Sequence, residues 1–119
     1  MPARILSISY DRTLLSSRQM LLERSGFAVS SAEGFVQALK RCGEGSYDLV
    51  VMGHSIPHED KLALFEVITR ECPVPVISLT RGLERDLPGA AATVDPFDQK
   101  TFLETVDRFL SQREKERRA

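Results

Sequence analysis

The run DLVVM at residues 48–52 is the feature that most constrains how this chain folds. Its apolar residues follow one another without a polar face, which is typical of a strand buried on both sides in a parallel sheet. Helices must then cover both faces of that sheet, and right-handed crossovers leave few topologies open. The run therefore predicts an α/β domain.

Strands and helices are expected to alternate along the rest of the chain. Asp11 is placed to cap a first helix that ends at Gly26, and the last helix carries an apolar stripe from Phe102 to Leu110. The other expected strands are 3–9, 27–32, 74–80 and 90–94, and the other expected helices are 34–45 and 61–72. This alternation predicts a doubly wound five-stranded parallel sheet in a three-layer αβα arrangement. The site is then expected at the carboxyl ends of the strands.

Composition restricts the class of protein. The chain has 119 residues, 42% hydrophobic content and a net charge of −1, which fit one domain with no electrostatic attraction to nucleic acid or to an anionic membrane. No apolar run reaches the length of a membrane span and no signal-peptide pattern is present, so a cytoplasmic protein is expected. Cys42 and Cys72 are expected to be reduced thiols packed as small hydrophobic residues.

The order of these segments resembles the CheY-like receiver domains of bacterial response regulators. The similarity runs from RILSISYD (4–11) to the final helix, with DLVVMGHSIP at the third strand, PVISLT at the fourth, and DPF (95–97) where the family has Lys-Pro-Phe. It implies the strand order 2-1-3-4-5. It also implies a fourth helix that is short or replaced by a loop, since only 14 residues (81–94) separate Thr80 from Asp95. A receiver-like domain is expected over 1–112, followed by a charged C-terminal tail over 113–119.

The family usually accepts a phosphoryl group on an Asp that ends the third strand. An acidic pair after the first strand binds Mg²⁺, a Ser or Thr ends the fourth strand, and a Lys ends the fifth, because the chemistry needs a nucleophilic carboxylate, a hard cation and a neutralising charge. The resemblance places Ser9, Tyr10, Gly53, Thr80 and Asp95 at these positions. Only Thr80 keeps the family's residue type, so the acceptor pocket is degenerate.

Glycine offers neither a nucleophile nor a metal ligand, so phosphorylation at position 53 is excluded. No catalytic residue, no Mg²⁺ and no other cofactor are expected. The resemblance then implies a pseudo-receiver in bacterial two-component-type signalling that is not an enzyme and acts through contacts with partner proteins. It is expected to bind neither nucleic acid nor membrane, and formation of a homodimer stays open.

Other readings of the same residues remain. The chain is alternatively a phosphorelay receiver that is modified on, or binds phosphate through, unconventional residues; His54, next to the vacant position, is the candidate acceptor. A small-molecule binder at the switch-point crevice is a third reading, although no Gly-rich phosphate loop supports it. The residues His54, His58, Glu59 and Asp60 could form a metal loop only if the H-x-x-x-H spacing were helical, and Pro57 argues against that.

Two further expectations concern the end of the fifth strand. Arg81 and Asp95 are hypothesised to form an ion pair that fills the vacated pocket, the alternative being two independent surface charges. The resemblance implies a cis peptide bond between Asp95 and Pro96 that fixes a tight turn.

Overall fold

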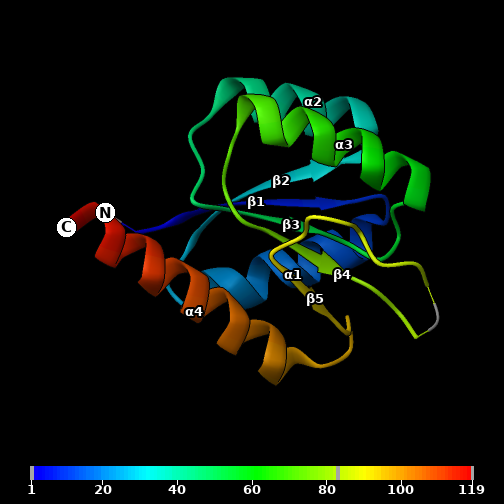
Figure 1. The fold of residues 1–119 in the computed structure, drawn as a ribbon. Coiled ribbons are helices and arrows are strands. Elements are labelled where there is room, and N and C mark those ends of the chain that lie inside the picture. The colour runs from blue at the N-terminus through cyan, green and yellow to red at the C-terminus, as the bar shows by residue number, and fades with distance from the viewer. Residues whose placement is uncertain (1, 83, 119) are drawn as a thin grey trace.

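The computed structural model describes residues 2–82 and 84–118. Five parallel strands form one sheet in the order β2-β1-β3-β4-β5, which confirms the predicted topology. Figure 1 shows helices α2 and α3 on one face of this sheet and α1 and α4 on the other. The elements are β1 (Arg4–Ser9), α1 (Arg12–Arg24), β2 (Ala28–Glu33), α2 (Gly34–Glu44), β3 (Leu49–Met52), α3 (His58–Glu71), β4 (Val76–Leu79), β5 (Ala92–Val94) and α4 (Gln99–Arg118).

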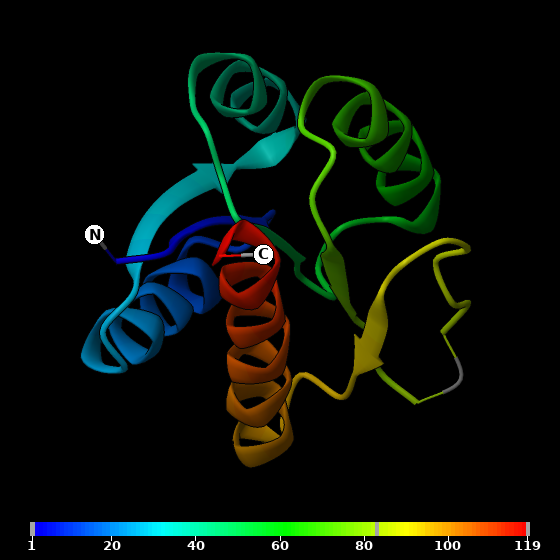
Figure 2. The same cartoon turned by 60° about the vertical axis from the view of Figure 1, so that its left-hand side comes forward.

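The sheet divides the hydrophobic core into two clusters. Figure 2 shows the two pairs of helices that cover them on opposite sides of the strands. Along β3, Val50 and Met52 belong to the cluster under α2 and α3, whereas Leu49 and Val51 belong to the cluster under α1 and α4. All four side chains are fully buried. The continuously apolar run is therefore buried on both faces as predicted, and each such side chain contributes about 1.5–3 kcal/mol to stability.

A loop takes the place of a helix between β4 and β5, as the short spacing predicted. The described residues of this segment contain no helix, yet Leu87 is buried in the cluster that also contains α3 residues. The Ala91 N–H donates to the Val76 carbonyl at 2.8 Å. Gly89 has φ of +88°, and a Cβ at this position would stand 2.9 Å from the Phe65 ring. The loop is therefore held closely against α3.

Substituting two glycines by alanine is expected to have opposite effects on stability. Gly89→Ala should destabilise the fold by about 1–2 kcal/mol, because it forces a side chain into the left-handed region and against Phe65. Gly43→Ala, inside α2 with open space around it, should instead stabilise by roughly 0.5–1 kcal/mol. Urea denaturation of both variants measures this, and equal shifts would contradict the close packing of the loop.

The far end of α4 is tied to the amino-terminal edge of the sheet. The Asp48 carboxylate accepts the Arg4 N–H at 2.9 Å and the Arg113 Nε–H at 3.2 Å, and it also pairs with Arg117. The residues expected as a charged tail belong to α4 up to residue 118. The domain boundary at residue 112 stays a prediction. Within the described chain, none of the helices combines the length and the apolar character needed to cross a membrane.

Candidate functional site

The predicted pocket positions lie together at the carboxyl edge of the sheet. Ser9 ends β1, and Gly53, Thr80 and Asp95 directly follow β3, β4 and β5. Backbone hydrogen bonds hold these ends together, from the Gly53 N–H to the Ile8 carbonyl at 2.9 Å and from the Thr80 N–H to the Val94 carbonyl at 3.0 Å. The ends of neighbouring strands therefore lie side by side at this edge of the sheet.

Arg18 occupies the space beside Gly53. This α1 residue is only 8% exposed, and its Nη1 donates to Ser7 Oγ at 3.0 Å and to the Ile8 carbonyl at 3.2 Å. A Cβ on Gly53 would stand 2.8 Å from Arg18 Nη2, so the guanidinium fills the volume that an acceptor side chain would need. Burial lowers the pKa of Arg18 to about 10, which still leaves the group charged at neutral pH.

A second cation reaches the same edge from the opposite face of the sheet. Lys61 on α3 is 4% exposed, and its Nζ donates to Ser78 Oγ at 3.0 Å and to the Leu79 carbonyl at 2.8 Å. Burial lowers the pKa of Lys61, although Glu84 acts in the other direction. The Thr80 hydroxyl is 3.3 Å from that of Ser78, so it serves this hydrogen-bonded cluster.

The nearby carboxylates are used elsewhere. Asp11 Oδ1 accepts the Leu14 N–H at 3.0 Å, which confirms its role as the cap of α1. Asp60 accepts the Tyr10 hydroxyl at 2.7 Å; burial, this hydrogen bond and the carboxylate charge together raise the pKa of Tyr10. No three metal-ligating side chains gather anywhere in residues 2–82 and 84–118. A hard divalent cation needs oxygen ligands, so the residues at this cationic edge do not fit Mg²⁺.

Ser9 links two loops of the site. Its hydroxyl is 2.9 Å from that of Ser55 and accepts the Asp11 N–H at 3.0 Å, while Ser55 Oγ accepts the Tyr10 N–H at 2.9 Å. The loop after β1 is therefore joined to the loop after β3 by side chains where the family has acidic residues.

Two expectations about Asp95 are wrong. Among the described residues no ion pair joins it to Arg81: Arg81 instead lies over the Phe97 ring, 5.5 Å from its centroid. Asp95 Oδ1 accepts the Phe97 N–H at 2.8 Å and its carbonyl accepts the Asp98 N–H at 3.1 Å. The described chain also contains no cis peptide bond, so the Asp95–Pro96 bond is trans. These two hydrogen bonds to the aspartate form the tight turn without a cis bond.

Neither histidine gains the partners that the alternative readings require. The His54 ring is tilted against the Phe97 ring with their centroids 5.8 Å apart, and no activating base contacts it among the described residues. Burial is the largest cause that lowers the pKa of His54, so its imidazole is neutral at pH 7. His58 begins α3 directly after Pro57, while His54 lies in the preceding turn, so the two do not share a helix. The replacement acceptor and the metal loop therefore have no support in this geometry.

Sequence reasoning missed Arg18 and Lys61, although a signal was present. Arg18 lies on the buried side of α1 with Leu15 and Leu22, and Lys61 lies on the buried side of α3 with Leu64 and Ile68. Both basic residues thus follow the helical spacing of the apolar stripe, i, i+3 and i+7. A basic residue at a position of such an apolar stripe indicates a buried cation.

No family model matches the chain. The transcriptional regulatory protein ResD of Bacillus subtilis is 28% identical over 101 residues, which cover 83% of this chain and 42% of ResD. The chain spans between 33% and 49% of the length of the curated relatives that it matches.

Solved structures are similar to this one over nearly the whole chain. The response regulator TrrA of Thermotoga maritima, in complex with Mg²⁺ and BeF, has a TM-score of 0.75 at 25% identity, covering 92% of this chain and 100% of that chain. The signal receiver domain of an HD domain-containing protein from Pseudomonas fluorescens has a TM-score of 0.84 at 20% identity, covering 97% of this chain and 99% of that chain. Sequence relatives and structural neighbours agree: the chain has the fold of CheY-like receiver domains, and its sequence is similar to those of transcriptional regulatory proteins and of a response regulator.

Proposed function

We propose that this receiver domain is a pseudo-receiver in two-component signalling, which acts through contacts with partner proteins and not through phosphotransfer. The observation that carries this proposal is the guanidinium of Arg18, which would stand 2.8 Å from any Cβ at position 53. A pocket built to accept a phosphoryl group needs carboxylates and a metal ion there. Here two buried cations, Arg18 and Lys61, lie at the carboxyl edge of the sheet instead.

The proposal extends to cofactors and location. The proposal includes neither Mg²⁺ nor another cofactor, which is supported by the carboxylates of Asp11 and Asp95, because both accept backbone N–H groups. A cytoplasmic location and a homodimer are further proposals, supported by the likeness to response regulators. The partner is expected to be a signalling protein, since the chain resembles the response regulator TrrA over nearly its whole length.

We expect no covalent phosphorylation by a small phosphodonor. The chain is incubated with acetyl phosphate and Mg²⁺, and separately with beryllofluoride and Mg²⁺, with intact mass and amide NMR as readouts. TrrA of Thermotoga maritima, whose structure contains Mg²⁺ and BeF, is the positive control. A mass increase of one phosphoryl group, or beryllofluoride shifts centred on residues 9–11 and 53–55, would overturn the proposal.

A Gly53→Asp variant tests whether the missing acceptor alone prevents phosphorylation. The variant restores a carboxylate at position 53. It does not restore the family's acidic pair, because Ser9 and Tyr10 stand there, or the family's lysine, because Asp95 stands there. We expect this variant to remain unphosphorylated as well, because the metal site is missing and Arg18 would pair with the new carboxylate. Phosphorylation of the variant alone would show that only the acceptor has been lost.

One observation favours a second function, the non-covalent binding of phosphate. Lys61 is a buried cation, and the described residues provide it with no ion pair. Titration with inorganic phosphate in the absence of Mg²⁺ tests this function. Saturable shifts at Ser78 and Thr80, next to Lys61, would support it, and their absence would remove it.

A further inference from the structure

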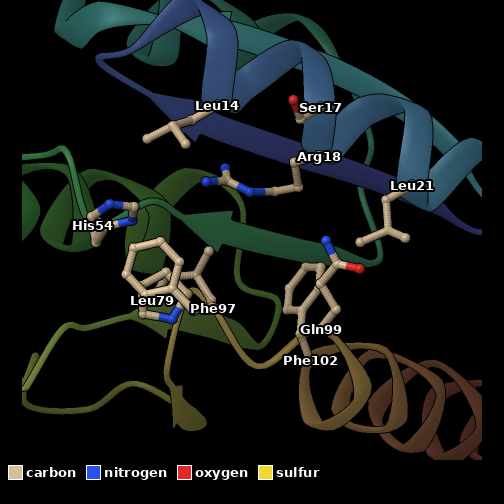
Figure 3. A pocket seen from close by; sticks show the side chains of 10 residues that line it. Leu14, Ser17, Arg18, Leu21, His54, Leu79, Phe97, Gln99 and Phe102 are labelled. Carbon is tan, nitrogen blue, oxygen red and sulfur yellow. The ribbon is translucent and has the colours of Figure 1, made fainter.

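A cavity of about 230 Å³ lies between α1, the end of β4 and the turn from β5 into α4. Figure 3 shows side chains from these elements converging on it. Most of its wall is hydrocarbon, from Leu14, Leu21, Leu79, Pro96, Phe97 and Phe102. A cavity of about 150 Å³ is enough to bind benzene. This one has room for a single aromatic ring with a short polar substituent.

Arg18 is the cation of this cavity. In Figure 3 its side chain leaves α1 and runs across the cavity toward His54. Arg18 donates two hydrogen bonds to the described residues, both from Nη1. Its Nη2 and Nε have no acceptor among these residues. No carboxylate of the described chain pairs with the guanidinium. A buried cation without a counter-charge is unfavourable, and a bound carboxylate would relieve that cost with planar, charge-assisted hydrogen bonds.

His54 supplies a second unsatisfied group beside the same cavity. Its Nδ1 is buried and has no hydrogen-bond partner among the described residues. The imidazole lies beside the Phe97 ring in a tilted arrangement, at the wall opposite α1. Buried polar atoms are nearly always hydrogen-bonded in native proteins, so a polar group in the cavity could serve as a partner for this atom.

We propose that this cavity binds a small organic carboxylate with an apolar body about the size of one aromatic ring. The carboxylate pairs with Arg18, and the body packs on Leu79, Phe97 and the other apolar residues of the wall. Inorganic phosphate fits less well, because the hydrocarbon wall would strip its water while offering one cation. The inference goes beyond the proposed function: the domain would take its input from a ligand and not from a phosphoryl group.

Ligand comparison on the unaltered chain is the decisive experiment. Phenylacetate is titrated into ¹⁵N-labelled protein, alongside phenylacetamide, its neutral counterpart, and inorganic phosphate. We expect saturable phenylacetate shifts centred on Ser17, Phe97 and Gln99, with binding of phenylacetamide weaker by roughly tenfold or more. Phosphate should not saturate these resonances.

Three results would overturn the proposal. The first is an absence of saturable phenylacetate shifts in the millimolar range. The second is equal binding of phenylacetamide, which would show that the cation is not recognised. The third is saturation of these amides by phosphate at the same concentrations, which would show that the apolar wall is not used.

A matched pair of variants then assigns the charge. Arg18→Met keeps the length of the side chain and should weaken phenylacetate binding by roughly tenfold or more. Arg24→Met removes an exposed arginine from the same helix and should leave binding unchanged. An equal loss in both variants would mean general charge attraction and would overturn the proposal. Where Arg18→Met fails to fold, by circular dichroism, the three ligands on the unaltered chain still decide.

Discussion

A Gly53→Asp variant is expected to be more stable than Gly53→Asn by about 2 kcal/mol at neutral pH. The two side chains have the same shape, and both meet the Ile8 carbonyl, which would stand 3.1 Å from their Cβ. Steric strain therefore cancels in the comparison. What remains is the charge: the aspartate pairs with the buried guanidinium of Arg18, while the asparagine cannot neutralise it.

Urea denaturation of the two variants at several pH values measures this difference. An aspartate next to Arg18 has its pKa lowered on folding, so its contribution is present above the unfolded value and is lost as pH falls below about 4. The asparagine variant should lack this part of the acid dependence. Equal stabilities at neutral pH would contradict the placement of Arg18 in the pocket.

Repeating the comparison in an Arg18→Met background isolates the pairing. The advantage of aspartate over asparagine should disappear there, because methionine has no charge to pair with the aspartate. The four variants form a double-mutant cycle, which isolates the energy of the pairing. An Arg24→Met background is the matched control, since Arg24 is exposed on the same helix. The advantage should persist in that control.

Removing the Asp48 carboxylate is expected to destabilise the fold by about 3 kcal/mol. Asp48→Ala leaves the Arg4 N–H without its acceptor and breaks the contacts with Arg113 and Arg117. Hydrogen exchange should also show lower protection in the last turns of α4. Asp107→Ala, an exposed change on the same helix, should shift stability by less than about 0.5 kcal/mol.

Asp48 also makes part of the stability sensitive to acid. Burial by itself would raise the pKa of Asp48, but the hydrogen bonds from Arg4 and Arg113 and the charge of Arg117 outweigh it, so the pKa is lowered. The stabilisation is therefore complete above the unfolded value and is lost as pH falls below about 4. The difference between the unaltered chain and Asp48→Asn should shrink over that range. A difference that does not change with pH would contradict this assignment.

The fold could be predicted because strand and helix patterns are local. DLVVM, with no polar face, required a sheet covered on both sides, and the short segment after Thr80 left no room for a full helix. The residue types at the strand ends, such as Gly53, were equally readable from the sequence. That they form a degenerate acceptor pocket stays a prediction.

The groups that fill the site could not be read in the same way. Arg18 and Lys61 reach the sheet edge through long side chains with many rotamers, and only packing selects one of them. The predicted ion pair between Arg81 and Asp95 is absent because packing does not constrain these two side chains. Both are exposed, and a local hydrogen bond to the Phe97 N–H was available to the aspartate at less entropic cost than a salt bridge.

The hydrogen bonds of Ser9 and Tyr10 have a mechanical consequence for the carboxyl edge. One residue holds Ser55 and the next holds Asp60, so the turn after β1 is fastened both to the turn after β3 and to the first turn of α3. Separating these segments would break the hydrogen bonds between them. A displacement of the turn after β1 would therefore strain the hydrogen bonds that connect it to the turn after β3 and to α3.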